Sequence, residues 1–515
     1  MTKKNLVDIW AVIVIVTFSS VSARNADAQT ASPIGIFENH ADIGTVLHAG
    51  TAQYDPSSGS YTLSASGENV WATNDHFQFV WKKMSGDVAL SADISFLGEG
   101  GNPHRKAVVM FRQDLDPDSI YADIALHGVG TSALQYRDIK GEVTREIGSN
   151  ISAAKRIRIV KRGNYVYMSL AKADGDEPQF AGGWMKIPLQ GTFYVGIGLC
   201  SHNKDAVEKA VFSKVTLQTL SASATASTPK LYSTLETVAI SSSVRHVAYI
   251  EAGRFKAPNW TPDGASFIFN KIDRVEKIPI AGGTPQVINV GPVRHPTADH
   301  GLSPDAKWFG VTDEAPGGSD TQIYVIPFDG GSPRRVTTNS ASFWHGWSPD
   351  GKTLVFVGER NDNDNHDSVY TIPVAGGEET RLTKDKSIND APEYSPDGKY
   401  IYYTSERTGL SQIWRMQPDG SNQEQVFADD YNNWFPHISP DGKWMVFLSY
   451  DGSVIGHPND QDVTLRLMSL GDKSIRVLAK LVGGQGTINS PSWSPDSSKL
   501  AFISYALIPE ESPQP

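Results

Sequence analysis

The sequence predicts an all-β protein in two parts, an N-terminal β-sandwich followed by a C-terminal six-bladed β-propeller. Three observations support this fold class: a turn motif that recurs through the second half, alternating apolar strands after each copy, and a high turn-residue content. The chain has 46 glycines and 30 prolines in 515 residues, which is typical of a protein with many short strands and turns. Its length exceeds one ordinary hydrophobic core, so more than one domain is expected.

The recurring element is a four-residue turn. Ser or Thr suits the first position of a type I turn, Pro presets φ at the second, Asp tolerates the third and Gly favours the fourth. Successive copies are 42 to 55 residues apart, a period that indicates a propeller or another repeat fold. The copies are TPDG at 261, SPDA at 303, SPDG at 348, SPDG at 395, SPDG at 439 and SPDS at 494.

Each turn is followed by strand-like segments that complete a blade. An alternating apolar strand such as KTLVFVG comes first, then a strand ending in Gly-Gly such as IYVIPFDGG, then a short one such as RRVT. With the residues before the turn as the innermost strand, each unit has four strands, which is a propeller blade. The sixth unit has room for only two strands, so YSTLETVAI and RHVAYIEA, upstream of the first turn, are expected to complete it. The predicted propeller therefore spans 232–507, is closed by strands from both ends, and leaves a tail at 508–515.

The first half lacks the repeat. Residues 34–218 contain short strands at roughly ten-residue spacing, which predicts a β-sandwich. The small-residue and proline segment SASATASTPK places a linker at 219–231.

The N-terminus predicts export. Lys3 and Lys4 precede the apolar run LVDIWAVIVIVTF, and ADA offers a cleavage site before Gln29, so residues 1–28 are interpreted as a signal peptide. The run contains Asp8 and is short for a membrane span, so no integral membrane segment is expected after cleavage. Cys200 is the only cysteine and excludes an internal disulfide. A large exported protein of this kind fits a bacterial periplasm or exterior.

These motifs resemble known families. The pattern W-S-P-D-G-K followed by I-P-x-x-G-G, in six copies, resembles the TolB-like propeller family with its PD40 (WD40-like) repeats. That broad family includes periplasmic protein-binding propellers, oligogalacturonate lyases and the non-catalytic domain of prolyl oligopeptidases. In the first half, ENVWATNDHFQFVWKKMSGDVAL and HRKAVVMFR resemble concanavalin-A/laminin-G-like sandwiches, which are often appended to secreted glycan-handling proteins.

The residues just before each turn are the candidates for a site, because innermost strands line the channel of a propeller. His300, His345, Glu393 and His437 come from four consecutive blades. Three imidazoles and a carboxylate form an acceptable set for a divalent metal such as manganese, zinc, iron or calcium. His345, His437 and Glu393 are also the catalytic candidates. The histidines at 300 and 345 are one residue out of register with the other two, and strand side chains alternate, so a packing role for them stays open.

Other residues are candidates for ligand contact. Trp344 and Trp434 are expected to stack on sugar rings, whereas Trp347 shares its place before the turn with Trp260 and Trp493 and is expected to be structural. Asn259 and Asp299 are further ligand-binding candidates, with His295 and Asp299 as alternative or supporting metal ligands. Two loops complete the set: 359–368, where Asp362, Asp364 and Asp367 either hold calcium or form a solvated insertion, and 451–462, a possible lid carrying His457.

Composition and missing motifs narrow the function. A net charge of −11 argues against a nucleic-acid binder, and no nucleotide cofactor is expected. Neither a Gly-x-Ser-x-Gly elbow nor a His-Glu-x-x-His motif occurs. The favoured hypothesis is an extracytoplasmic recognition protein that binds glycan, or an envelope protein, through the channel mouth and the sandwich. The alternatives are a metal-assisted polysaccharide lyase or glycosidase at the channel mouth, and a Tol-like envelope scaffold. The family resemblance implies that some oligogalacturonate lyases bind a metal through several histidines and a glutamine. The histidine spacing of this sequence does not match that set.

Overall fold

The computed structural model describes residues 33–98, 101–220, 228–291, 293–314, 320–360 and 366–509. Every regular element in these ranges is a β-strand, so the all-β prediction is confirmed. The described ranges contain no helix, and therefore no helix in them is long and apolar enough to cross a membrane. The predicted signal peptide at 1–28, and most of the tail at 508–515, lie outside the described residues.

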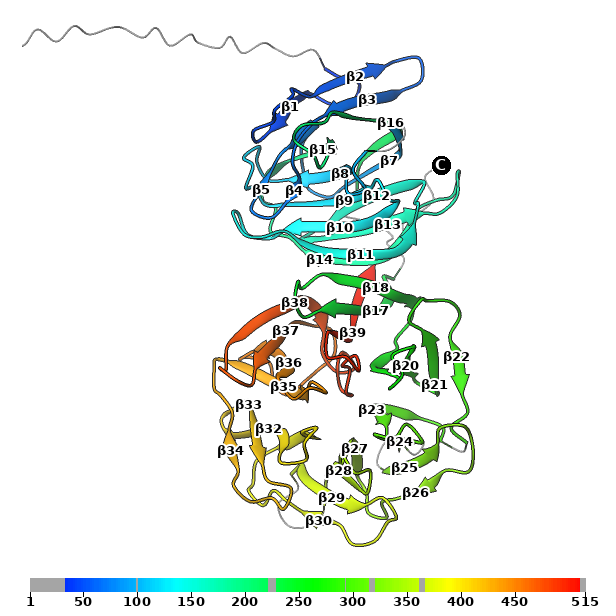
Figure 1. The fold of residues 1–515 in the computed structure, drawn as a ribbon, viewed down its shortest axis with the longest axis vertical. Coiled ribbons are helices and arrows are strands. Elements are labelled where there is room, and N and C mark those ends of the chain that lie inside the picture. The colour runs from blue at the N-terminus through cyan, green and yellow to red at the C-terminus, as the bar shows by residue number, and fades with distance from the viewer. Residues whose placement is uncertain are drawn as a thin grey trace, which may run out of the picture.

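The N-terminal unit is built on two large sheets and a small hairpin (Figure 1). The ten-stranded sheet has the order β1 (Asn39–Ile43), β6 (Phe77–Ser85), β15 (Thr192–Cys200), β8 (Lys106–Arg112), β9 (Tyr121–His127), β10 (Thr131–Arg137), β11 (Arg145–Ser152), β18 (Arg245–Ala252), β17 (Lys230–Ala239), β39 (Lys499–Ile508). This larger sheet continues into three strands from the later part of the chain, β18, β17 and β39. The seven-stranded sheet has the order β14 (Gln179–Lys186), β13 (Tyr165–Ala171), β12 (Arg156–Arg162), β7 (Val88–Leu97), β16 (Glu208–Thr219), β3 (Ser60–Ala65), β2 (Thr51–Asp55). The hairpin pairs β4 (Val70–Trp71) with β5 (Asn74–Asp75).

The two large sheets share one hydrophobic core. Alternate residues of β8 and β9 in the ten-stranded sheet, such as Val109 and Ile124, meet residues of β7 and β12 in the seven-stranded sheet, such as Leu90 and Ile159. Alternation along each strand places one set of side chains in this core and the other set on the opposite face.

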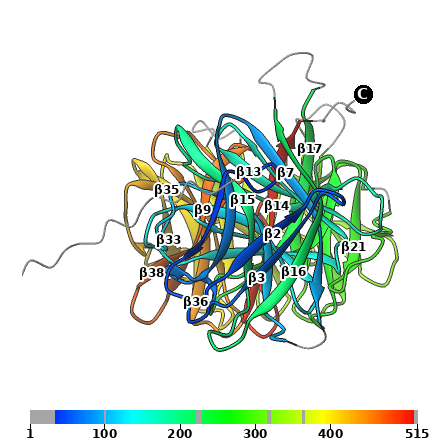
Figure 2. The same ribbon diagram turned by 90° about the horizontal axis from the view of Figure 1, so that it is seen from above.

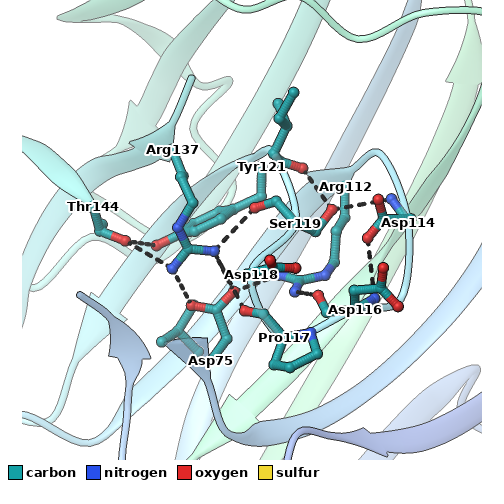
Figure 3. A network of polar contacts seen from close by, with 12 residues as sticks. Asp75, Arg112, Asp114, Asp116, Pro117, Asp118, Ser119, Tyr121, Arg137 and Thr144 are labelled. Carbon is teal, nitrogen blue, oxygen red and sulfur yellow. Dashed lines mark hydrogen bonds and ion pairs between the residues drawn. The ribbon is translucent and has the colours of Figure 1, made fainter. Parts of the chain in front are cut away.

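The opposite face of the ten-stranded sheet carries a buried polar network (Figure 3). Asp75 on β5 accepts hydrogen bonds from the guanidinium groups of Arg112 on β8 and Arg137 on β10, at 2.6 and 2.9 Å. All three side chains are fully buried. Because two guanidinium groups surround a single carboxylate, this network ties the β4–β5 hairpin to the sheet.

The second half of the chain forms five separate four-stranded antiparallel sheets arranged in a ring (Figure 1). The first contains β19 (Lys256–Trp260), β20 (Ser266–Lys271), β21 (Arg274–Pro279) and β22 (Gln286–Ile288). The second contains β23 (Pro296–Leu302), β24 (Trp308–Glu314), β25 (Thr321–Pro327) and β26 (Arg334–Arg335). The third contains β27 (Ser342–Trp347), β28 (Thr353–Gly358), β29 (Ser368–Pro373) and β30 (Thr380–Arg381). The fourth contains β31 (Asn389–Tyr394), β32 (Ile401–Thr408), β33 (Leu410–Met416) and β34 (Glu424–Gln425). The fifth contains β35 (Tyr431–Ile438), β36 (Trp444–Asp451), β37 (Gln461–Ser469) and β38 (Ile475–Gly483).

The repeated turn has the expected chemistry. In the copy at 348–351, the Gly351 amide donates to the Ser348 carbonyl at 2.8 Å. The Ser348 hydroxyl donates to the Asp350 carboxylate at 2.6 Å, and the Lys352 amide donates to the same carboxylate at 3.1 Å. The same bonds recur at Ser303, Ser395 and Ser439, so the turn is a local structure that each copy encodes by itself.

The prediction of a six-bladed propeller closed by strands from both ends needs correction, because five blades stand as four-stranded sheets of their own. The segments predicted to close the ring do pair as expected: β17 runs antiparallel to β39 along its whole length and to β18. However, β18 also pairs in parallel with β11, at Ile147–Arg245 and Gly148–His246. The open edge of the closing strands is therefore covered by the N-terminal unit, which makes them part of the ten-stranded sheet.

A buried ion pair holds these closing strands together. Arg245 on β18 contacts Glu236 on β17 at 2.7 Å with both side chains buried, and the Ser504 hydroxyl on β39 donates to the same carboxylate at 2.6 Å. Figure 1 shows the N-terminal unit at the rim of the ring, next to β17 and β18, and Figure 2 looks from that unit toward the rim. The two parts of the protein are thus joined through one continuous sheet.

Candidate functional site

A cavity of about 720 Å³ opens at the channel mouth, at the N-terminal ends of the innermost strands, the end opposite to the repeated turns. All five separate sheets contribute to it, together with the segment before β39. Its polar lining residues are Arg254, Lys256, Asn270, Lys271, His295, Thr297, Asp299, Glu314, His345, Glu359, Asp367, Asp390, His457, Gln485 and Asn489.

A β-bulge in each innermost strand decides which side chains face this cavity. The register shifts lie between Lys256 and Asn259, Pro296 and His300, Trp344 and Gly346, Asp390 and Glu393, and Trp434 and His437. A bulge inserts one extra residue and re-aims the side chains around it. Residues at or before the bulge, such as Asp299, His345 and Asp390, line the cavity, whereas Glu393 and His437, after it, do not.

The centre of the cavity is a carboxylate shared by two imidazoles. Asp390 on β31 lies 3.3 Å from His345 Nε2 through one oxygen and 3.3 Å from His457 Nε2 through the other. His457 comes from the connection between β36 and β37, and its ring packs against Trp434 and Phe435. The arrangement therefore joins the third, fourth and fifth sheets at the mouth.

The charges of this cluster shift one another. Burial opposes charging of His345 and His457, but the hydrogen bond and negative charge of Asp390 outweigh it and raise the pKa of both imidazoles. Burial alone would raise the pKa of Asp390, yet the two imidazoles hold it well below its usual range. Burial and the nearby Asp390 and Glu359 carboxylates raise the pKa of Asp367 to about 7. Burial also raises the pKa of Asp299.

The four predicted metal ligands do not converge, and this prediction is corrected. His437 contacts the Glu393 carboxylate through Nδ1 and the Ile488 carbonyl through Nε2 at 2.5 Å. His300 contacts Asn259 through Nδ1 at 2.8 Å. Each contact joins neighbouring blades, so these residues tie the ring together.

Only His345 of that set faces the cavity, because the bulges separate it from the other three. Within the described ranges, no three or more His, Cys, Asp or Glu side chains are grouped so that they could hold one metal ion. The residues present therefore do not fit the predicted divalent metal. Asp362 and Asp364 lie outside the described residues.

The predicted ligand-stacking tryptophans are buried. Trp344 and Trp434 are each 1% exposed and belong to hydrophobic clusters between blades, which corrects their assignment to ligand contact. The structural interpretation of Trp347 is confirmed: its Nε1 donates to the Gly301 carbonyl of the preceding blade at 3.1 Å. Trp493 makes the same contact with the His437 carbonyl at 3.0 Å. Asn259 is also buried, and its Nδ2 donates to the Pro491 carbonyl at 2.8 Å.

The buried position of Trp344 predicts the effect of a small substitution opposite it. A Cβ added at Gly301 would lie 2.5 Å from Trp344 Cη2, so Gly301→Ala is expected to destabilise the protein by about 1–3 kcal/mol through overpacking. Gly346→Ala is the matched control, since Gly346 has the same place before its turn and its added Cβ would meet no atom closer than Val355 Cγ1 at 3.2 Å. Urea unfolding of both variants measures the difference. An equal loss in both would contradict the tight contact at Trp344.

Sequence reasoning missed the residue at the centre of the site. Asp390 lies one residue before the segment that aligns with the other blades, and Asn489 occupies the corresponding position before β39. His457 was identified only as part of a loop. The signal that would have found Asp390 and Asn489 is the fifth position before each turn, which carries a polar residue in three of the six copies, Lys256, Asp390 and Asn489.

Comparisons with known proteins agree with this architecture. The family model described as the TolB beta propeller domain, PD40, matches residues 339–475. An uncharacterised protein of Agrobacterium fabrum is 42% identical over 252 residues, which is 49% of this chain and 85% of the relative. A solved structure designated TolB from Agrobacterium tumefaciens is 41% identical, has a TM-score of 0.51, and covers 54% of this chain and 99% of its own.

A more distant relative is the Protein TolB homolog of Chlorobium luteolum. It is 31% identical over 160 residues, which is 30% of this chain and 32% of the relative, so the chain spans about a third of its length. Taken with the closer Agrobacterium relatives and with the ring of four-stranded sheets, these matches show that the chain belongs to the TolB-like β-propeller family.

Proposed function

We propose that this protein is an extracytoplasmic recognition protein that binds a segment of a partner protein in the mouth of its propeller channel. The observation that carries the proposal is the cavity of about 720 Å³, which is lined by polar side chains from the first four separate sheets and, through His457, from the connection between β36 and β37 of the fifth. Several of these, including Asn270, Asp299 and His345, are nearly buried. Buried polar groups around an open cavity suit the recognition of a polar ligand.

Exposed apolar side chains near the cavity favour a protein partner over a glycan. Ile272 lines the cavity and is 84% exposed, and Ile455, two residues before His457, is 94% exposed. Exposed apolar groups around a polar centre are a feature of protein-binding surfaces. The two tryptophans expected to stack on sugar rings are buried, so a glycan in this mouth has less support.

A metal-assisted lyase or glycosidase also has less support, because most of the side chains predicted to act in it do not face the cavity. Of the residues predicted to act in it, only His345 faces the cavity, whereas His300, His437 and Glu393 are engaged between blades. Nothing in the positions of the three residues provides a shared centre for a reacting group.

We also propose where in the cell this protein acts and which kind of domain its N-terminal unit is. The name of the Chlorobium relative refers to TolB, and that of a Francisella tularensis relative, 33% identical over 82 residues, to the Tol-Pal system. Together with the sequence of residues 1–28, these names support a periplasmic or secreted bacterial protein that acts on an envelope partner. We further infer that the N-terminal unit is a concanavalin-A/laminin-G-like sandwich, from the motifs in its sequence and its two sheets around one core.

The test is selection of random linear peptides that bind the purified full chain. Peptides that bind at the mouth are expected to lose at least ten-fold in affinity when Ile272 and Ile455 are both replaced by aspartate. Val287→Asp is the matched control, because Val287 is also an exposed apolar residue, at 63%, and does not line the cavity. Peptides whose binding is unchanged by the double substitution, or a glycan array that binds through the mouth while peptides do not, would contradict the proposal.

A further inference from the structure

The lining of the channel mouth is acidic once its ion pairs are taken into account. Five carboxylates line the cavity, those of Asp299, Glu314, Glu359, Asp367 and Asp390, against the three cations of Arg254, Lys256 and Lys271. Two of these cations are engaged outside the lining: Arg254 contacts Asp460 at 2.7 Å, and Lys271 contacts Glu251 at 2.7 Å and Glu276 at 3.0 Å. Asp390 is engaged as well, by the imidazoles of His345 and His457, so the four other carboxylates face one lysine, Lys256, that has no ion pair within the described residues.

Asp299 is the most informative of these carboxylates, because it is only 6% exposed. It accepts a hydrogen bond from the Thr297 hydroxyl at 2.9 Å and one from the Asn489 amide. Among the described residues it forms no ion pair with Arg or Lys. Buried charges in proteins are ordinarily paired with an opposite charge. The positive charge of the His345 imidazole lowers the pKa of Asp299, but burial outweighs it and the net shift is upward, so a cationic ligand would supply the counter-charge that Asp299 lacks.

A second observation points to a ligand that donates hydrogen bonds. Asn270 is 3% exposed and lines the cavity. Its Nδ2 donates to the Pro296 carbonyl at 2.9 Å, while its Oδ1 has no hydrogen-bond partner within the described part of the chain. A buried acceptor without a donor is unusual in a native protein. The cavity lining thus holds carboxylate oxygens and a buried amide oxygen without a donor.

Ammonium and guanidinium groups have this character. Both carry positive charge and several N–H donors, and neither has an acceptor. A sugar hydroxyl would supply a donor but no charge, and an anionic group would be repelled by the carboxylates. A metal ion would need three or more ligands at one point, and the described residues contain no such group.

We propose that the mouth takes an organic cation, the ammonium or guanidinium group of a lysine or arginine on the bound protein segment, against the carboxylates of Asp299 and Asp367. This inference rests on the proposed function and names the chemistry of the partner. It assigns Asp299 as the buried counter-charge and Asn270 Oδ1 as a hydrogen-bond acceptor. His345 and His457 then hold Asp390 in place beside the bound cation.

The experiment uses three small probes of matched size on the full chain: N-acetyl-arginine amide, N-acetyl-lysine amide and N-acetyl-citrulline amide. Citrulline has the shape of arginine without its charge. Binding is measured by calorimetry and by the imidazole NMR signals of His345 and His457. At least one cationic probe is expected to shift those signals and to bind at least ten-fold more tightly than the citrulline probe.

Substitutions locate the effect. Asp299→Asn with Asp367→Asn is expected to abolish the preference for the cationic probes, while Glu378→Gln, an exposed acid outside the cavity, leaves it unchanged. Circular dichroism and thermal unfolding verify that the double variant is folded; if it is not, Asn270→Leu replaces it and is expected to weaken the cationic probes alone. Equal binding of the citrulline probe would overturn the inference, as would a cation preference that survives the double variant. The inference would also be overturned if calcium chloride displaced the probes at a concentration lower than that of the probes, and if Asp299→Asn with Asp367→Asn abolished that displacement.

The two proposals fail differently. Peptides that bind through Ile272 and Ile455 but carry no lysine or arginine, and that are insensitive to Asp299→Asn, would leave the proposed function standing and remove this inference. The opposite result, cationic probes that bind at Asp299 while no peptide binds at the mouth, would keep the cation site and remove the protein partner.

Discussion

Replacing Asp75 by alanine is expected to lower the free energy of unfolding by about 3–5 kcal/mol. Asp75 is the shared partner of two guanidinium groups, at 2.6 Å from Arg112 and 2.9 Å from Arg137, and all three side chains are fully buried (Figure 3). Without the carboxylate, two buried positive charges face each other. The loss of an ion-pair partner in the interior is costly because the remaining charges cannot reach water.

The other contacts of the network do not compensate for that loss. Arg137 also donates to the carbonyls of Ser119 and Ala72, at 2.9 and 3.0 Å, and Arg112 donates to the Asp116 carbonyl. These neutral acceptors orient the guanidinium groups but do not neutralise them. Urea unfolding, followed by the fluorescence of the N-terminal unit, measures the effect.

Lys140→Ala is the control for this prediction. Lys140 lies beside the same loop and contacts Asp114 at 3.0 Å and Asp116 at 2.5 Å, but its side chain is 42% exposed. An exposed ion pair of this kind contributes about 0–1 kcal/mol. If Asp75→Ala cost no more than Lys140→Ala, the buried network would not be a main source of stability in this unit.

Replacing Asp390 by asparagine is expected to have the largest effect in the propeller. The change keeps the size of the side chain but removes the charge that both imidazoles contact at 3.3 Å. Because the hydrogen bond and negative charge of Asp390 are the main effects that oppose burial at both imidazoles, the pKa values of His345 and His457 are expected to fall in this variant. Titration of the two imidazole signals by NMR measures these changes directly.

The same substitution gives a pH-dependent loss of stability. A histidine whose pKa is raised by folding contributes stability that is fully present below its unfolded pKa and is lost as pH rises through the folded value. The Asp390 carboxylate, whose pKa is lowered, is charged throughout this range. The loss on Asp390→Asn is therefore expected to be about 3 kcal/mol at pH 6, from two hydrogen bonds to charged groups, and smaller at pH 9.

Glu314→Gln is the matched control, since Glu314 lines the same cavity and is not among the main causes of the pKa shift of either imidazole. It is expected to leave both imidazole titrations unchanged. A loss for Asp390→Asn that is the same at pH 6 and pH 9 would show that the histidines do not depend on this carboxylate.

Several elements of the fold could be predicted because their information is local. The turn at 348–351 is specified by its own four residues, whose hydrogen bonds close within the turn. The strand after it, β28, is a short apolar run whose residues 354–358 are all buried, and such a run is itself typical of a strand covered on both faces. The pairing of β17 with β39 followed from counting strands in the last repeat, because a ring closes only when that count is complete.

The candidate site could be predicted only in part. His345 and Asp299 were identified by their place before the turns, and both line the cavity. His300, Glu393 and His437 have equally suitable side chains, but they lie on the other side of the bulges and bind neighbouring blades. A bulge changes the direction of side chains by one residue, and no residue type marks its place in the sequence.

By itself, the sequence determined the repeat, the turns, the strands and the closure of the ring, since each depends on residues close together or on a simple count. Only the tertiary structure decided that β18 continues into the N-terminal sheet through β11, and that Asp390 lies between His345 and His457. These contacts join residues far apart in the chain. Their partners are selected by the geometry of the packed sheets, and that geometry exists only once the ring has closed.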